Sequence, residues 1–367
     1  MAQRLSRSLL RVAGSQLKPE VQTLLHRSSP RIAIARNSVF QTNVQQSRFQ
    51  KRYAATASST AAFPPTAPTP NTTTVDVPHL GGITAAYQTA LPINPDKPTL
   101  ILVNSFTTSS ELYRSQFANV ELTERMNLVA IELLGHGQTR TKTENWSYWD
   151  TAQMNLEVMD ALNIPKAFVL GTSQGGWITA RMALLAPKRI QGIIPLGTSM
   201  DKESERSRAV GCWDAPNLLT PNIEAWTSET ETKDFDIGEE FADFLIDIGF
   251  GKNCPMETRD TWRELIRANY KGDEGRRRAR MAAINLRDRD GLHERLKEIK
   301  CPVLWLHGTD DAVYSVENAQ HEIKMFTNSP DAKLEVVKGG QHFLSSSNRK
   351  EVDQALINFV GKYGKSN

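Results

Sequence analysis

The 367-residue chain has an ordinary globular composition, with 39% hydrophobic and 23% charged residues. This composition excludes a collagen, a coiled coil and a disulfide scaffold. No run of about 18 apolar residues occurs, so the sequence offers no candidate for a membrane-spanning helix. The three cysteines match no ligand spacing, and no glycine-rich phosphate or dinucleotide motif is present. We therefore expect no cofactor and no metal.

The charge is distributed unevenly along the chain. Residues 1–53 contain ten Lys or Arg and one acid, which gives +9, so the remainder carries −6 against the total of +3. The segment is also rich in Ser and Gln, and its first turns can separate an apolar face from the arginines. These features are typical of a mitochondrial transit peptide and predict a location in the matrix. The alternative is a basic arm that binds nucleic acid or acidic lipid.

Residues 54–75 consist mainly of Ala, Thr and Pro, with one aromatic residue, Phe63. Because so few large apolar side chains are available, this segment is predicted to be a disordered linker. Order is expected to begin near residue 76. We divide the ordered part into a core, residues 76–200 and 296–367, and an insertion, residues 201–295.

Within the core, short apolar runs alternate with amphipathic stretches of helical length. This alternation predicts an α/β fold with a mostly parallel sheet flanked by helices. Strands are expected at residues 82–88, 99–104, 128–133, 167–170, 192–196, 302–307 and 333–337. Helices are expected at residues 110–124, 149–163, 174–187, 315–327 and 349–363.

The insertion, residues 201–295, has no strong strand pattern and includes amphipathic pieces at 239–248 and 259–270. We predict a helical cap over the carboxyl ends of the strands, where open α/β sheets bind ligands. Its aromatic residues either line an acyl pocket or form the cap's own core; they are Trp213, Trp226, Phe241, Phe244, Phe250 and Trp262. The arginine-rich run at 276–280 either holds an anionic substrate or is a solvated helix face.

The strongest motif is Gly171-Thr-Ser173-Gln-Gly175, which follows an apolar strand and leads directly into a predicted helix. In this context a strained turn exposes the serine hydroxyl above the sheet. Small residues at 171 and 175 are needed because the strand and helix backbones approach closely. Ser173 is the predicted nucleophile, and the backbone N–H of Gln174 is predicted to face the oxyanion. The alternative is an ordinary tight connection between strand and helix.

A serine nucleophile needs a base and a group that orients the base. For a serine on such a turn, the acid follows along the chain and the histidine comes last. Asp310 and Asp311 both follow the strand expected at 302–307. We predict Asp311 as the acid, with Asp310 as the alternative; the unused aspartate is expected to be a solvated turn residue or a helix N-cap.

The predicted base is His342, which lies in a glycine-containing loop just before the terminal helix. The other six histidines fit less well. His26 lies in the basic leader, His79 precedes the sheet, His293 is in the insertion, His321 is inside a helix, His307 is expected to be a satisfied core imidazole, and His136 is expected to shape the site from a neighbouring loop.

The second oxyanion donor is expected in the loop after the strand at 99–104. The backbone N–H of Phe106 is the candidate donor, and its ring is a candidate wall of the acyl pocket. The same loop also has a simpler interpretation, in which Ser109 or Ser110 is only a helix N-cap. The same loop can provide both the Phe106 donor and the helix N-cap.

Five segments in this order resemble the α/β-hydrolase superfamily over residues 76 to about 364: NSFTTSSELY, ELLGHGQT, DALNIPKAFVLGTSQGGW, CPVLWLHGTDD and GGQHFLSSS. Where the more usual pattern has His-Gly, this chain has Asn104-Ser105, which is similar to the Asn-Ser pair of 3-oxoadipate enol-lactonases, a family of cap-bearing serine hydrolases. This likeness does not by itself establish a lactone substrate. A serine nucleophile argues against the haloalkane dehalogenase and epoxide hydrolase branches, which use Asp.

These residues predict a serine hydrolase that cleaves a carboxylic ester, lactone or thioester of a small molecule. Ser173 would form an acyl-enzyme, His342 would transfer the proton, and Asp311 would hold the imidazolium. One alternative is an acyltransferase that passes the acyl group to an alcohol or peroxide. The other is a non-catalytic ligand-binding protein with the same fold. No nucleic-acid partner is expected.

Overall fold

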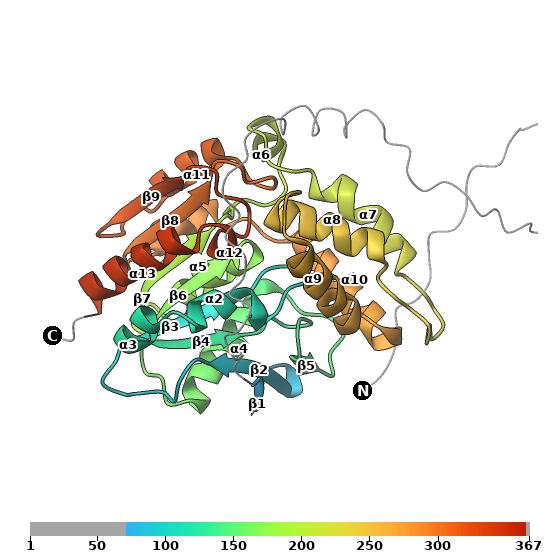
Figure 1. Ribbon diagram of the computed structural model, residues 1–367, viewed down its shortest axis with the longest axis horizontal. Coiled ribbons are helices and arrows are strands. Elements are labelled where there is room, and N and C mark those ends of the chain that lie inside the picture. The colour runs from blue at the N-terminus through green and yellow to red at the C-terminus, as the bar shows by residue number, and fades with distance from the viewer. Residues whose placement is uncertain (1–70, 365–367) are drawn as a thin grey trace, which may run out of the picture. The chain divides into compact units, whose positions relative to one another are not determined.

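A nine-stranded sheet organises residues 71–364, the part of the chain that this computed structural model describes (Figure 1). The strands are β1 (Thr73–Val77), β2 (Ile83–Thr89), β3 (Thr99–Val103), β4 (Asn127–Ile131), β5 (Arg140–Thr141), β6 (Ala167–Thr172), β7 (Ile190–Leu196), β8 (Val303–Gly308) and β9 (Ala332–Val337). Their order is β1-β2-β4-β3-β6-β7-β8-β9, and β5 pairs with β2. All pairs from β4 to β9 are parallel, and those of β2 are antiparallel.

The helices of the core pack in two groups around this sheet. They are α2 (Arg114–Phe117), α3 (Val120–Arg125), α4 (Tyr148–Ala161), α5 (Gln174–Leu185), α11 (Val316–Glu322), α12 (Leu344–Ser347) and α13 (Arg349–Tyr363). α4 packs against α5, whereas α13 packs against α2 and α3. Every residue of β3, β4 and β6 is buried, as expected of strands covered on both faces. The predicted α/β fold with a mostly parallel sheet flanked by helices is confirmed.

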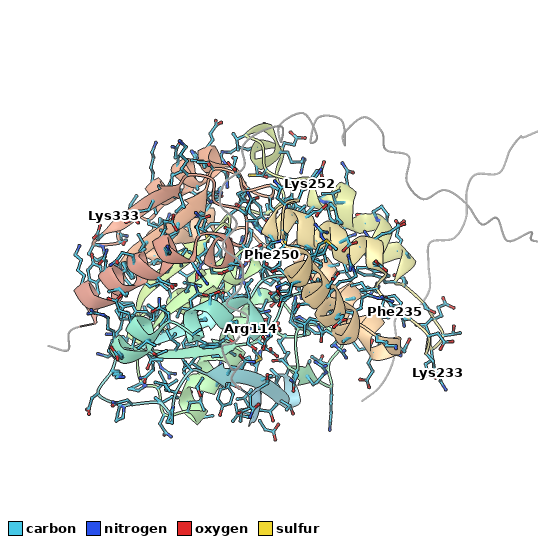
Figure 2. The ribbon with its side chains drawn as sticks, viewed as in Figure 1. Arg114, Lys233, Phe235, Phe250, Lys252 and Lys333 are labelled. Atoms are coloured by element: carbon cyan, nitrogen blue, oxygen red, sulfur yellow. The ribbon has the colours of Figure 1, made fainter. Side chains whose placement is uncertain are left out.

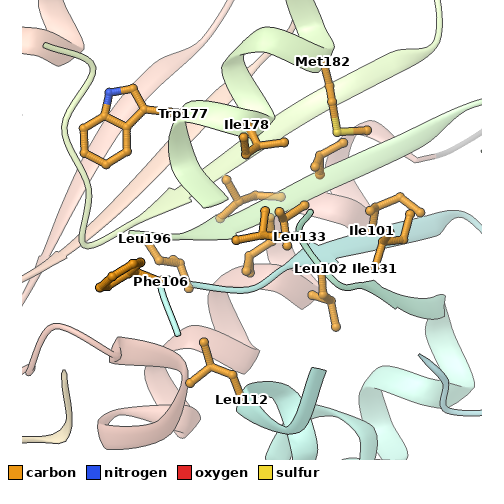
Figure 3. Close-up of a cluster of buried hydrophobic side chains, with 14 of the residues drawn as sticks. Ile101, Leu102, Phe106, Leu112, Ile131, Leu133, Trp177, Ile178, Met182 and Leu196 are labelled. Atoms are coloured by element: carbon orange, nitrogen blue, oxygen red, sulfur yellow. The ribbon is translucent and has the colours of Figure 1, made fainter. Parts of the chain in front are cut away.

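The centre of the core lies under the loops that carry the predicted site. Figure 3 shows Ile101 and Leu102 of β3, Ile131 of β4 and Ile178 of α5 in one apolar cluster, with Phe106 at one end. Burying side chains of this size stabilises the fold by about 1.5–3 kcal/mol each. The loops after these strands therefore start from a rigid base.

Five α-helices and one 3₁₀ helix, η3 (His293–Glu298), stand between β7 and β8; the α-helices are α6 (Glu205–Ala209), α7 (Ala215–Ala225), α8 (Glu239–Phe250), α9 (Met256–Asn269) and α10 (Gly272–Asp288). The five α-helices lie within residues 201–295, which we call the helical insertion. α8 packs on α9 and α7 packs on α10, beside the sheet (Figure 1). The amphipathic pieces expected at 239–248 and 259–270 correspond to α8 and α9. No helix of residues 71–364 is long and apolar enough to cross a membrane.

The beginning of the ordered core differs from the composition-based boundary at residue 76. β1 starts at Thr73, inside the predicted linker 54–75, and pairs with β2 so that Thr73 faces Tyr87 and Val75 faces Ala85. An edge strand of an antiparallel pair needs few apolar residues, because one of its faces stays exposed. Composition therefore did not separate β1 from the linker. The predicted transit peptide, residues 1–53, lies outside the described residues.

A buried ion pair joins the two ends of the helical insertion to each other and to the core. Arg289, just after α10, contacts Glu203, just before α6, at 2.7 Å, and both side chains are at most 4% exposed. The Arg289 guanidinium also lies 4.0 Å from the centre of the Trp177 ring on α5. Because an unpaired buried charge is costly, this pair keeps the entry and exit segments of the insertion side by side.

A second cluster at the same junction contains Asp201, His293 and Glu322. His293 Nε2 lies 2.8 Å from Glu322 Oε1 on α11, and His293 Nδ1 lies 3.8 Å from Asp201 Oδ1. Burial lowers the pKa of His293, but the hydrogen bond and attraction to Glu322 and the attraction to Asp201 outweigh it, so the pKa is raised. Arg206 opposes this rise, and His321 faces the ring at 6.4 Å.

We expect His293→Gln to lower the thermal unfolding midpoint more at about pH 6 than at about pH 9. Because folding raises the pKa of His293, its protonation contributes stability that is fully present below about pH 6.5 and is lost as the pH rises through the folded-state pKa. The midpoint of wild type and variant is measured across this range. The matched control His321→Gln, at an exposed position, should not lower the midpoint more at pH 6 than at pH 9, because folding lowers the pKa of His321. An equal loss at every pH in the His293 variant contradicts the assignment.

Candidate active site

Ser173 lies at the turn between β6 and α5, as predicted. Its backbone has φ 52° and ψ −116°, a left-handed conformation that is uncommon for a residue other than glycine. Such strain costs on the order of 1–3 kcal/mol and persists only where surrounding contacts impose it. Here the Ser173 N–H donates to Leu196 O at 2.8 Å, and the Gly176 N–H donates to Ser173 O at 2.8 Å.

Glycines make the close approaches around this turn possible. A Cβ on Gly171 would lie 2.1 Å from Gly175 O, and one on Gly175 would lie 2.3 Å from the carbonyl oxygen at the end of β3. Because backbone atoms cannot move aside, both positions exclude a larger residue. Gly197, which follows β7 with φ 48°, has the same role toward His342, since a Cβ there would lie 2.6 Å from His342 O. The contact between Gly197 and His342 could not be predicted from the sequence.

His342 contacts Asp311 and not Asp310. His342 Nδ1 lies 3.0 Å from both carboxylate oxygens of Asp311, whose side chain is fully buried. Asp311 Oδ1 also accepts hydrogen bonds from the N–H groups of Val313 at 2.8 Å and Tyr314 at 3.0 Å. Asp310 instead accepts a hydrogen bond from the neighbouring threonine hydroxyl at the surface. Of the two adjacent aspartates, only Asp311 is placed to orient the imidazole.

The surroundings of Asp311 favour its ionised form. Burial raises the pKa of this carboxyl group, but the attraction and hydrogen bond to His342, the attraction to His307 and the Tyr314 N–H outweigh it, so the pKa is lowered. His307 is fully buried, with Nε2 2.9 Å from Tyr314 O and 3.5 Å from Asp311 Oδ2. As predicted, His307 is a core imidazole, but only its Nε2 has a hydrogen-bond partner among the described residues, and its Nδ1 has none. An ionised Asp311 would stabilise a positive charge on His342.

Ser173 and His342 line the same cavity, which encloses about 430 Å³, part of it open to solvent. The core contributes the loop at 105–108 to this cavity, and the insertion contributes one wall. The residues of that wall are Trp213 before α7, Leu245, Ile246, Ile248 and Phe250 of α8, Trp262 and Ile266 of α9, and Leu286 of α10. The helical insertion therefore closes the space beside the serine.

The six aromatic residues of the insertion divide into two groups. Trp213, Phe250 and Trp262 line the cavity. The Phe250 ring, which Figure 2 labels, lies 5.4 Å from the Trp262 ring and 4.9 Å from the Phe343 ring of the core. The remaining three, Trp226, Phe241 and Phe244, pack on one another, with the Trp226 and Phe241 ring centres 5.1 Å apart. Both expected uses of these aromatic residues are present.

The loop after β3 is held by two polar side chains, Asn104 and Thr108. Asn104 Nδ2 donates to Thr108 O at 2.8 Å, and Asn104 Oδ1 accepts from the Leu133 N–H at 3.0 Å. Thr108 Oγ1 accepts from the Ser105 N–H and donates to Ser105 O, both at 2.9 Å. The Phe106 ring lines the cavity, as predicted. Asn104 thus braces the loop in which this chain departs from the usual His-Gly pair.

Two backbone N–H groups beside the cavity remain available to a ligand. The Phe106 N–H donates to no other residue among 71–364. Gln174 is the first residue of α5, and the first N–H groups of a helix have no partner within it. The positive end of the helix dipole adds to the attraction for an anion. Ser109 caps the 3₁₀ helix η2 (Ser110–Tyr113), as the simpler interpretation of this loop predicted, and the oxyanion role of Phe106 stays a prediction.

His136 lies behind Phe106, with the two ring centres 6.2 Å apart. Burial lowers its pKa to about 4, so the ring is neutral at physiological pH. Its Nδ1 lies 2.9 Å from Leu134 O, which makes Nδ1 the donor of that neutral ring. His136 therefore supports the wall of the cavity and does not line it.

Within residues 71–364, one group of side chains has the types and spacing that could hold a metal ion: Asp201, His293 and Glu322. Their ligand atoms are engaged in hydrogen bonds. His293 Nε2 contacts Glu322 Oε1, which also accepts from the Ser199 hydroxyl at 2.9 Å, and Glu322 Oε2 accepts from the Met200 N–H at 2.8 Å. This group lies outside the cavity that contains Ser173.

The sequence model of the alpha/beta hydrolase fold matches residues 98–348, which is more than half of the chain. The chain belongs to the α/β-hydrolase family. Its members' order of strand, serine turn, acid and histidine is the order found here along β6, β8 and the loop before α12.

Two relatives and one solved structure illustrate the similarity of this α/β hydrolase to known proteins. The dihydrolipoyllysine-residue acetyltransferase component of the acetoin cleaving system of Pseudomonas putida is 22% identical over 270 residues; the match covers 72% of this chain but only 64% of that protein. The 3-oxoadipate enol-lactonase 1 of Acinetobacter baylyi is 23% identical over 232 residues, which cover 61% and 75% of the two chains.

A thermophilic esterase from Thermogutta terrifontis shares the fold, with a TM-score of 0.65 and 18% identity over 79% of this chain and 99% of the esterase. The predicted resemblance to α/β hydrolases, including the enol-lactonase-like branch, is confirmed. The protein is an enzyme of the α/β-hydrolase class.

Replacing the buried aspartate of this α/β hydrolase should separate the two adjacent carboxylates. We expect Asp311→Asn to lower kcat about 10³-fold or more, because the amide cannot hold the imidazolium and favours the wrong tautomer of His342. The matched control Asp310→Asn should keep nearly full activity. Initial rates with 4-nitrophenyl butanoate measure both. A larger loss in the Asp310 variant than in the Asp311 variant would show that the assignment is wrong.

Proposed function

We propose that this protein is a serine hydrolase that cleaves a carboxylic ester, lactone or thioester through an acyl-enzyme intermediate. The observation that carries the proposal is the buried Asp311 paired with His342, which lines the same cavity as the strained Ser173. Membership of the α/β-hydrolase family agrees with it. A purely structural role would not require a strained serine, a histidine and a buried carboxylate at one cavity.

In the proposed mechanism, the Ser173 hydroxyl attacks the carbonyl carbon while Nε2 of His342 takes its proton. Asp311 holds the Nδ1 side of the ring, which presents Nε2 to the serine and stabilises the imidazolium. The proton then passes to the leaving oxygen or sulfur as the tetrahedral intermediate collapses. Water then attacks the acyl carbon while Nε2 of His342 takes its proton, and that proton passes to the Ser173 oxygen as the bond to the acyl group breaks and the acid leaves.

The tetrahedral oxyanion would accept hydrogen bonds from the N–H groups of Phe106 and Gln174. A single well-aimed donor of this kind typically contributes roughly 3 kcal/mol of transition-state stabilisation. Asn104 and Thr108 position the Phe106 donor, since they hold both ends of the loop at 105–108. The start of α5 positions the Gln174 donor.

The serine assignment is tested by covalent labelling. We expect Ser173→Ala to abolish labelling by a fluorophosphonate. No acyl-enzyme should then be detected by mass spectrometry, because Ser173 is the hydroxyl that His342 would activate. The matched control is Ser199→Ala, which removes the serine of the second Gly-Thr-Ser sequence and should leave labelling intact. Full labelling of the Ser173 variant would refute the mechanism. Ester products in added methanol would indicate acyl transfer in place of hydrolysis.

The oxyanion loop is tested by Thr108→Val, which keeps the side-chain shape but removes both hydrogen bonds to Ser105. We expect kcat to fall about tenfold with little change in KM, because a transition-state interaction weakens by roughly the worth of one hydrogen bond. The control Ser109→Ala removes only the cap of η2. An unchanged kcat, or a loss confined to KM, would contradict a positioning role for Thr108.

A further inference from the structure

The insertion contributes only apolar residues to the cavity beside Ser173, whereas all of its polar lining residues belong to the core. Every residue that the insertion contributes is Leu, Ile, Phe or Trp. The polar lining consists of Ser173, His342 and three hydroxyl residues of the loop at 105–108, all on the core side. Among the described residues that line the cavity, none is Asp, Glu, Lys or Arg. Only the reacting end of a substrate would meet polar groups.

From this division we infer that the acyl group of the natural substrate is uncharged and apolar, and that an acyl chain ending in a free carboxylate is strongly disfavoured. The inference rests on the proposed function, because it names the substrate class of the same site. An ionised carboxylate placed against the insertion wall would lose its water and gain no charged partner, which is strongly unfavourable.

The arginine-rich run at 276–280 does not supply the missing cation. Arg276 pairs with Asp273 at 2.9 Å, and Arg277 pairs with Glu144 and Asp273. Arg278 donates to a backbone carbonyl at 2.6 Å, and Arg280 donates to a threonine hydroxyl at 2.8 Å. None of these arginines lines the cavity. The structure therefore does not support binding of an anionic substrate in the cavity by this run. Its side chains instead pair with α10 and the segments that pack against it.

One relative acts, by its name, on a substrate with a charged acyl group, which the cavity of this chain would disfavour. That relative is named for the enol-lactone of 3-oxoadipate, which is a dicarboxylic acid. The chain shares the Asn-Ser pair at 104–105 with that branch, but the described lining of its cavity offers no positive charge to a second carboxylate. The pair Asn104-Ser105 lies in the loop that would bind the oxyanion, whereas residues of the insertion would select the acyl group.

The test compares esters of equal acyl length that differ only in terminal charge. The full chain is assayed with 4-nitrophenyl hexanoate, with the mono-4-nitrophenyl ester of adipate, and with the methyl ester of that half-ester. We expect kcat/KM for the hexanoate to exceed that for the charged half-ester by about 100-fold, because the half-ester must bury an unpaired charge. The neutral methyl ester should recover most of the loss. The pentanoate and glutarate pair repeats the comparison for a shorter chain.

The outcomes distinguish the inference from the function on which it rests. Equal kcat/KM for hexanoate and half-ester overturns the inference and leaves the serine hydrolase intact. Turnover of none of the esters, together with no labelling of Ser173, overturns the proposed function itself. A methyl ester as poor as the charged half-ester also overturns the inference, since size and not charge would then set the preference.

A variant of the wall gives an independent measurement. Ile248 lines the cavity from α8 and is only half-buried, so a longer side chain can be accommodated there. We expect Ile248→Arg to raise the ratio of half-ester to hexanoate kcat/KM about tenfold, because it provides a counter-charge. The matched uncharged control is Ile248→Gln, which should leave the ratio near that of wild type. If this ratio is unchanged in the arginine variant, the charge of the cavity wall does not control the preference for an uncharged acyl group.

Discussion

The site depends on how closely the backbone segments at the carboxyl ends of the parallel strands can approach one another. A Cβ on Gly171 would lie 2.1 Å from Gly175 O, one on Gly197 would lie 2.6 Å from His342 O, and one on Gly308 would lie 2.0 Å from Gly340 O. Each contact brings together two segments that carry a reacting group or its support. Larger residues at these positions would separate the turn of Ser173, the loop of His342 and the end of β8.

The helical insertion contributes to the same arrangement from the opposite side. The N–H of Phe343, next to His342, donates to Gly249 O in α8 at 2.8 Å. A Cβ on Gly249 would lie 2.3 Å from the Phe343 ring, so the end of α8 sits directly on the histidine loop. The insertion therefore does more than close the cavity, because its position and that of the base are linked through one backbone hydrogen bond and a packed ring.

The strongest local motifs could be predicted from the sequence, but contacts that form only between distant segments could not. The turn at Ser173 could be predicted because a glycine-flanked serine between strand and helix has few other uses. Asp311 rather than Asp310 makes the contact with His342, as predicted, although adjacent aspartates are alike in sequence. Gly197 could not be recognised, because the atom that excludes a side chain there belongs to residue 342.

Two elements were misplaced for local reasons. β1 looked like linker since an edge strand carries little apolar surface. The helix expected at 110–124 is divided into η2, α2 and α3, because the Asn119 side chain accepts from the Glu121 N–H at 3.0 Å and starts a new helix. That asparagine was a readable signal, and the apolar periodicity on both sides concealed it.

The two parts of the chain contribute different properties to the site. The core supplies the strained Ser173, the paired His342 and Asp311, and the braced loop after β3. The insertion supplies apolar surface from α8, α9 and α10, where side-chain shape and charge can vary without disturbing those contacts. Under the proposed function, the reacting groups would all come from the core, whereas much of the surface that meets the acyl group would come from the insertion. The two parts contact each other next to the site at the end of α8, against Phe343, and at the Trp213 N–H, which donates to Val313 O at 2.8 Å. A change in the wall at the Phe343 contact would reach the neighbouring His342.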